Sequence, residues 1–123
     1  MIRLLLVDDQ PVVRKGLRMR LTMEPDITVV GEAGTGEEAL VLVRSLAPDI
    51  VLMDVEMPGM DGITTTEILR TSIQQSAVVM LSIYDDVHTR ARAQAAGAAG
   101  FVEKRGAIEA LLTTIRQTAK FTG

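Results

Sequence analysis

Residues 2–9 have the sequence IRLLLVDD, an apolar run that ends at two adjacent acids, Asp8 and Asp9. A second apolar run, IVLM at residues 50–53, ends at Asp54. In an open parallel sheet the carboxyl ends of the strands lie along one edge, where ligands bind, so we expect the three carboxylates to converge. Two carboxylates about 4 Å apart repel by roughly 4 kcal/mol at an effective dielectric of about 20. A site that holds three of them therefore requires a proton or a cation, and a divalent metal ion is the simplest solution.

Apolar runs that are typical of buried strands recur along the chain, at residues 2–7, 27–33, 50–53, 77–81 and 98–102. The segments between these runs have the length and the apolar period of helices. The closing segment is the clearest, because one face of a helix there would carry Ile108, Leu111, Leu112 and Ile115. The alternation predicts an α/β fold in which helices cover both faces of a five-stranded, doubly wound parallel sheet.

The expected fourth helix, about residues 85–96, differs from the others because it is rich in alanine. We expect its buried side chains to be mainly Ala91 and Ala95, together with Val87. Such a helix buries little apolar area, so it should be the easiest helix to shift. Two boundaries also carry signals: Asp61 is a candidate N-cap for the third helix, and Gly97 is a candidate C-terminal stop for the fourth.

Composition narrows the classes of protein to consider. The 123 residues suit one domain, and 47% of them are hydrophobic, with no Trp and no Cys. The formal net charge is −3, whereas a DNA-binding surface is strongly basic, so we expect no direct contact of this segment with nucleic acid. Its apolar runs are far shorter than the roughly 18 residues of a membrane span. We therefore expect a cytoplasmic protein without membrane contact.

Two further strand ends bring a hydroxyl and an ammonium group to the same edge. Ser82 closes the fourth run and Lys104 follows the fifth. Asp8 and Asp9 are suited to hold Mg²⁺, which prefers oxygen ligands, and Asp is a known acceptor of phosphoryl groups. Asp54 is thus a candidate nucleophile and metal ligand, and Lys104 and Ser82 would stabilise the oxygens of an incoming phosphoryl group.

In order along the chain, these residues resemble the receiver domain of two-component response regulators. The match includes Asp8 and Asp9, the stretch DVEMPGMDG at residues 54–62, Ser82, Phe101 and Lys104. The resemblance implies a flavodoxin-like (βα)5 fold with strand order 2-1-3-4-5. It makes Asp54 the phosphoacceptor for a sensor histidine kinase, and it makes Asp8, Asp9 and the backbone carbonyl of Glu56 ligands of Mg²⁺.

The resemblance also implies an output. Ser82 and Phe101 become a switch pair that reshapes the surface around the fourth helix after phosphorylation. The stretches GEAGTGEEA at residues 31–39 and AAGAAGF at residues 95–101 are similar to the branch with LuxR/NarL-type helix-turn-helix output domains. Residues 1–123 would then be the receiver alone, without that DNA-binding domain, and phosphorylation would promote a homodimer. Two departures from the family pattern are Arg105 and Gly106 after the lysine, where many receivers have Pro, and Phe101 in place of Tyr.

Three other interpretations can be weighed against this one. A small phosphatase or phosphotransferase with Asp8 as nucleophile would favour the pattern Asp-x-Asp, and here the two acids are adjacent. A dinucleotide site near Gly34 and Gly36 is disfavoured, because Glu37 and Glu38 would repel a pyrophosphate. A receiver fold used only as a constitutive interaction module would not need the complete acidic set. We therefore expect a regulatory phosphoacceptor rather than an enzyme with turnover.

Overall fold

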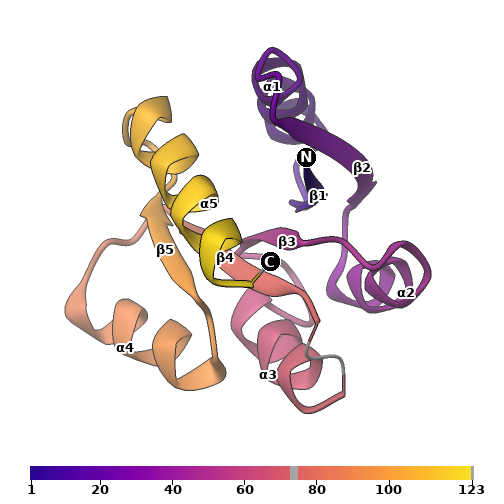
Figure 1. Cartoon of the computed structure of the whole chain (residues 1–123). Helices are drawn as coiled ribbons and strands as arrows, with labels where there is room; N and C mark the ends of the chain where they lie inside the picture. The colour runs from indigo at the N-terminus through magenta and orange to yellow at the C-terminus, as the bar shows by residue number, and fades with distance from the viewer. Residues whose placement is uncertain (73–74, 123) are drawn as a thin grey trace.

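The computed structural model describes residues 1–72 and 75–122, and within them strands and helices alternate along the chain (Figure 1). The strands are β1 (Ile2–Val7), β2 (Ile27–Ala33), β3 (Ile50–Asp54), β4 (Ala77–Ser82) and β5 (Gly100–Glu103). The helices are α1 (Pro11–Leu21), α2 (Gly36–Leu46), α3 (Gly62–Ser72), α4 (Val87–Ala96) and α5 (Ile108–Thr122). Among these helices, none has the length and apolar content that crossing a membrane requires.

The strands form one parallel sheet in the order β2-β1-β3-β4-β5, which confirms the predicted fold. The pairing register brings the strand ends level with one another. Val7 lies opposite Met53, Asp54 opposite Leu81, and Ser82 opposite Glu103. The residues that follow β1, β3, β4 and β5 therefore meet at one edge of the sheet.

Alternate side chains of the central strands enter two separate hydrophobic cores. Leu5, Val51 and Met80 point to the face covered by α2, α3 and α4. On the opposite face, Leu6 and Leu52 pack against side chains of α1 and α5. Because both faces are covered, the strands are almost continuously apolar, as is usual for parallel sheets.

Several strand boundaries differ by one or two residues from those expected. β3 and β4 each extend one residue further than predicted, through Asp54 and Ser82. β5 starts at Gly100 rather than at residue 98, because the ladder with β4 begins with the pair of Val79 and Gly100. The Ala99 amide donates to the Val78 carbonyl at 2.8 Å and leads the chain into that ladder.

The predicted buried face of α4 is wrong. Val87 is 86% exposed, Ala91 and Ala95 are also exposed, and the helix buries Ala93 and Ala96 instead. Alanines at four positions between 91 and 96 fit more than one helical face, and their methyl groups are too alike in size to select one. The prediction that α4 buries little apolar area is nevertheless confirmed.

The two predicted helix boundary residues are confirmed. The Asp61 carboxylate accepts a hydrogen bond from the Thr64 amide at 2.8 Å, as an N-cap does. Gly97 ends α4 with a φ of 104°, a left-handed conformation that glycine adopts without strain. Asp61 thus marks the start of α3 after the Asp54 turn, and Gly97 marks the end of α4 before β5.

Candidate functional site

The turn after β3 fixes the position of the Asp54 side chain. The Glu56 amide donates to Asp54 Oδ1 at 3.2 Å, and the Gly62 amide donates to the Val55 carbonyl at 3.0 Å. A Cβ atom on Gly62 would lie 2.1 Å from the Asp54 carbonyl oxygen, so only glycine allows α3 to start this close to the strand. The strand end and the start of α3 thus hold the carboxylate from both sides.

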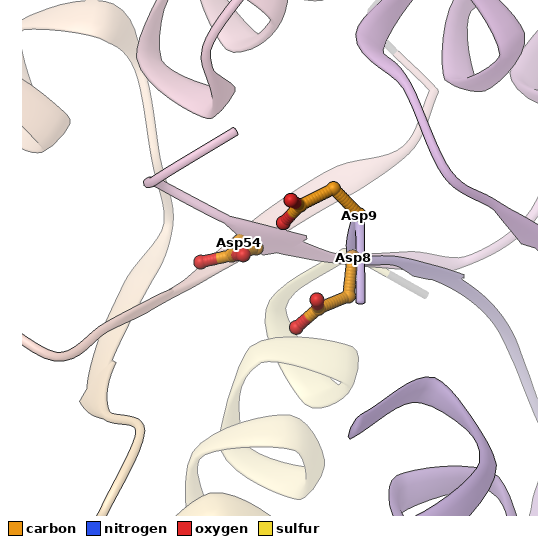
Figure 2. A group of neighbouring side chains, drawn as sticks. All are labelled: Asp8, Asp9 and Asp54. Atoms are coloured by element: carbon orange, nitrogen blue, oxygen red, sulfur yellow. The ribbon is translucent and has the colours of Figure 1, made fainter. Parts of the chain in front are cut away.

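The structure brings the three predicted carboxylates together. One oxygen from each of Asp8, Asp9 and Asp54 lies within 4.8 Å of the other two. Figure 2 shows the three side chains extending from the ends of β1 and β3 toward a common region. Asp8 and Asp54 are almost fully buried and Asp9 is half-buried. Residues 45 positions apart in sequence therefore form one acidic cluster.

Lys104 reaches this cluster from the end of β5. Its Nζ lies 3.1 Å from Asp54 Oδ2 and 2.8 Å from Asp8 Oδ2. The contact with Asp54 is a hydrogen bond, whereas the contact with Asp8 is an ion pair whose angles do not meet those of a hydrogen bond. The Lys104 amide also donates to the Ser82 carbonyl at 2.8 Å, which ties the lysine to the end of β4.

Burial and neighbouring charges change the pKa values of Asp54 and Lys104. Burial raises the pKa of Asp54 to about 6, the nearby Asp8 carboxylate adds to the rise, and Lys104 opposes it. Burial lowers the pKa of Lys104, but the close contacts with the Asp8 and Asp54 carboxylates outweigh that effect and leave its pKa above the ordinary value. The site therefore carries more negative charge than its single ammonium group can offset.

These side chains fit a divalent metal ion. Asp8 Oδ2 is buried, and its charged partner is the Lys104 ammonium at 2.8 Å, so a single ammonium faces three carboxylates. Asp9 and Asp54 supply the further carboxylate oxygens that Mg²⁺ prefers. A pocket of about 440 Å³ opens beside them and is lined by Asp9, Gln10, Val13, Asp54, Glu56, Ile83, Lys104 and Arg105.

Ser82 lies at the same edge, but its hydroxyl is held by another residue. Ser82 Oγ donates to Glu56 Oε2 at 2.8 Å and accepts from the Tyr84 amide at 2.9 Å. The Ile83 amide donates to Glu56 Oε1 at 3.1 Å. Sequence reasoning named Glu56 only for its backbone carbonyl and missed this role of the side chain, because no sequence pattern places a carboxylate after Asp54 next to residue 82.

Phe101 lies in β5, opposite Met80, and is partly buried. Its ring packs on the core beneath α4, and the Arg90 guanidinium group lies 4.6 Å from the ring centroid. The aromatic member of the predicted switch pair is therefore covered by a residue of α4 rather than exposed.

The sequence of the chain matches the model of the response regulator receiver domain over residues 4–116. The chain belongs to this family. The receiver is 40% identical over 116 residues to the nitrate/nitrite response regulator protein NarL of Escherichia coli strain K12, a match that covers 94% of this chain and 54% of NarL. It is also 40% identical over 117 residues to the response regulator GacA of Pseudomonas aeruginosa, with 95% and 55% covered.

A solved structure gives the same result. The two-component response regulator of the LuxR family from Aurantimonas sp. SI85-9A1 superposes with a TM-score of 0.94 at 33% identity. The alignment covers 98% of this chain and 86% of that one. The receiver spans about half the length of the curated relatives it matches.

Proposed function

We propose that Asp54 accepts a phosphoryl group from a phosphohistidine of a sensor histidine kinase. The observation that carries this proposal is the buried Asp54 carboxylate, which shares the Lys104 ammonium with Asp8 and lines the pocket. An Asp54 oxygen would form the new P–O bond while the P–N bond of the phosphohistidine breaks. The histidine nitrogen keeps the electron pair of that bond and takes up a proton.

The other residues of the site would stabilise charge during this transfer. The Lys104 ammonium lies beside Asp54 Oδ2 and would contact a phosphoryl oxygen, as phosphoryl transfer requires positioned positive charge. Asp8, Asp9, Asp54 and the Glu56 carbonyl would hold Mg²⁺. When bound, the ion neutralises charge on the phosphoryl oxygens and the carboxylates. The Ser82 hydroxyl would donate to a phosphoryl oxygen after leaving Glu56.

The raised pKa of Asp54 agrees with a site that binds a cation. A carboxyl with a pKa of about 6 is partly protonated in mildly acidic solution, and only the carboxylate is a nucleophile. A divalent cation beside Asp8 and Asp54 would lower that pKa by favouring the charged form. Phosphorylation should therefore depend on Mg²⁺, and without the ion the reactive carboxylate fraction of Asp54 should decrease as the pH falls below about 6.

We propose that the phosphorylated receiver controls transcription by forming a homodimer. Ser82 and Phe101 would act as the switch pair, and the altered surface would lie around α4. DNA would be contacted through a helix-turn-helix domain outside residues 1–123, since the receiver itself has a net charge of −3. The similarity to NarL, GacA and a LuxR-family structure supports this output. The same resemblance supports a cytoplasmic location without membrane contact.

In this regulatory function each receiver accepts one phosphoryl group. A phosphatase, the alternative, would instead react with many substrate molecules in turn. One equivalent of phosphoryl group should accumulate on the receiver. A phosphatase with Asp8 as nucleophile would instead release many equivalents of phosphate from a small ester. The ion pair of Asp8 with Lys104 and its burial favour the first of these two functions, because they leave Asp9 and Asp54 rather than Asp8 on the pocket wall.

The decisive experiment uses Asp54→Asn with a radiolabelled small acyl phosphate and Mg²⁺. The native receiver should incorporate about one equivalent of label, the variant none, and chelation of Mg²⁺ should abolish the signal. Asp85→Asn is the matched control, because Asp85 is exposed and lies outside the pocket. Undiminished labelling of Asp54→Asn would refute the proposal.

A second variant separates phosphorylation from switching. Ser82→Ala should still accept the label, because Asp54, Lys104 and the acidic cluster are unchanged, but its phosphorylated form should dimerise less. Sedimentation velocity on samples of equal label content makes this comparison. Full dimerisation of the variant would remove Ser82 from the switch.

A further inference from the structure

The Glu56 side chain connects the phosphoacceptor turn to the loop before α4. Its two carboxylate oxygens accept from Ser82 Oγ at 2.8 Å and from the Ile83 amide at 3.1 Å. Its own amide donates to Asp54 Oδ1 at 3.2 Å. One residue therefore contacts both the proposed site of phosphorylation and the segment that precedes α4.

A hydroxyl group has one proton to donate, and in this structure the Ser82 proton goes to Glu56. A phosphoryl oxygen on Asp54 could receive it only after the bond to Glu56 breaks. Hydrogen bonds to a carboxylate are stronger than those between neutral groups. Glu56 thus opposes the movement of Ser82 until a stronger acceptor is present.

Phosphorylation would supply that acceptor and would repel Glu56 as well. A phosphoryl group brings a charge of about −1.5 to −2 at neutral pH, and Glu56 and Asp54 line the same pocket. Like charges in a partly buried pocket disfavour each other. The same event would therefore attract the Ser82 proton and push the Glu56 carboxylate away.

The loop that Glu56 holds leads directly into α4. Besides Ile83, the Tyr84 amide is held there, because it donates to Ser82 Oγ at 2.9 Å. The helix that follows buries only Ala93 and Ala96. Release of the two Glu56 contacts would consequently free a short loop joined to a helix whose buried side chains are two alanines.

We propose that Glu56 is a positioning residue that holds Ser82 and the Ile83 amide in the unphosphorylated arrangement, and that phosphorylation of Asp54 displaces it. Glu56 thereby sets how much of the receiver adopts the switched arrangement before any signal arrives. The second half of this inference rests on the proposed function of Asp54. The first half is a statement about the unphosphorylated chain alone.

The first half is tested without a phosphoryl donor, by amide hydrogen exchange on Glu56→Gln. A glutamine side chain has one acceptor oxygen and an NH₂ group that cannot accept, so it cannot accept from both the Ser82 hydroxyl and the Ile83 amide. We expect exchange of the Ile83 and Tyr84 amides to rise by roughly 10-fold, the equivalent of a typical net hydrogen bond. Glu67→Gln on the exposed face of α3 is the control for charge, and it should leave both amides unchanged.

The second half uses the fluorescence of Tyr84, which is the only tyrosine in the sequence and the chain has no Trp. Phosphorylation of the native receiver should change this signal. Glu56→Gln should show part of that change beforehand and a smaller response to phosphorylation at equal label content. A variant that was only less stable would keep the full response.

The outcomes separate this inference from the proposed function. Native protection of Ile83 and Tyr84 in both Glu56→Gln and Glu56→Ala would overturn the role of Glu56, whatever Asp54 does. Absence of label on the native receiver would overturn the proposed function and leave the exchange result standing. Normal labelling with an unaltered Tyr84 response in both variants would refute displacement of Glu56 by phosphorylation.

Discussion

The helices α4 and α5 lie on opposite faces of the sheet beside β5 (Figure 1), yet they are held very differently. α5 buries Leu111, Leu112 and Ile115, whereas α4 buries only the methyl groups of Ala93 and Ala96. Burial of a large aliphatic side chain contributes about 1.5 to 3 kcal/mol, several times the contribution of one methyl group. The comparison indicates that α5 holds the fold together and that α4 can move at low cost.

Ion pairs increase the contrast. Arg116 of α5 donates to Asp26 at 2.8 and 2.9 Å and to Glu24 at 2.7 Å, which links α5 to the loop between α1 and β2. The ion pair of α4 joins Arg90 only to Asp85, five residues earlier in the chain. The ion pairs of α5 thus connect distant parts of the sequence, while the ion pair of α4 is local and its Arg90 guanidinium otherwise lies over the Phe101 ring of β5.

The largest effect is expected from Ile115→Ala in α5. Ile115 is fully buried, and such truncations cost about 2 to 5 kcal/mol through lost transfer free energy and the cavity left behind. Urea denaturation should show this loss in the free energy of unfolding. The matched truncation in α4, Ala93→Gly, should cost about 1 kcal/mol. Equal losses for the two variants would contradict the comparison.

The next largest effect on stability is expected from the charge of Asp54, at the edge of the sheet where both helices begin. Between pH 3.8 and about 6 the folded chain holds a proton on Asp54 that the unfolded chain has released, so stability falls as the pH rises through this window. A shift of one pKa unit corresponds to about 1.4 kcal/mol. Because asparagine does not ionise, Asp54→Asn should be more stable than the native chain by roughly 3 kcal/mol at pH 7. The difference should vanish below pH 4.

Mg²⁺ provides the control for this prediction. If the ion binds the carboxylates, it stabilises the native chain more than Asp54→Asn, which has one carboxylate fewer, so the gap at pH 7 should narrow as Mg²⁺ is added. Thermal unfolding at several concentrations measures the gap. A gap that is constant between pH 4 and pH 7 would show that the pKa of Asp54 is not raised.

A smaller and more local effect is expected at the start of α4. The Asp86 carboxylate accepts from the Thr89 amide at 2.6 Å and caps the helix. Asp86→Ala should lower the stability of α4 by about 1 kcal/mol. Amide exchange should therefore become faster in α4, with a smaller change in α5. A uniform increase across both helices would mean that α4 opens only when the whole fold unfolds.

The smallest effect is expected from Val87→Ala, which tests the corrected face of α4. Val87 is 86% exposed, so the substitution should change the free energy of unfolding by less than about 0.5 kcal/mol. Urea denaturation beside Ala93→Gly gives the comparison. A loss above about 1 kcal/mol would restore the face predicted from the sequence.

The features predicted well from sequence are those with strong patterning. The aliphatic strands and the apolar face of α5 have one energetically reasonable arrangement, so β1 and β2 occur over the predicted residues. The convergence of Asp8, Asp9 and Asp54 follows from the rule that parallel strand ends share an edge. Both predictions rest on backbone geometry that many residues enforce together.

The features missed from sequence depend on single side chains. The predicted buried face of α4 was wrong, because four alanines of equal size do not indicate which side of the helix is buried. The contact of Glu56 with Ser82 joins residues 26 positions apart and depends on rotamers at the ends of two strands. The sequence predicts Lys104 near the carboxylates. It does not predict that the lysine contacts both Asp8 and Asp54, because this depends on the conformation of its side chain.

The close approach of Gly62 to the Asp54 carbonyl has a consequence for engineering. Gly36 is similarly enclosed, since a Cβ atom there would lie 2.3 Å from Thr65 Oγ1. A combinatorial library designed to change partner choice should leave positions 62 and 36 fixed and place its diversity on outward-facing α4 residues such as Ala91 and Ala95. Variants would then differ on the outer surface of α4 while retaining the close approach of α3 to the Asp54 carbonyl.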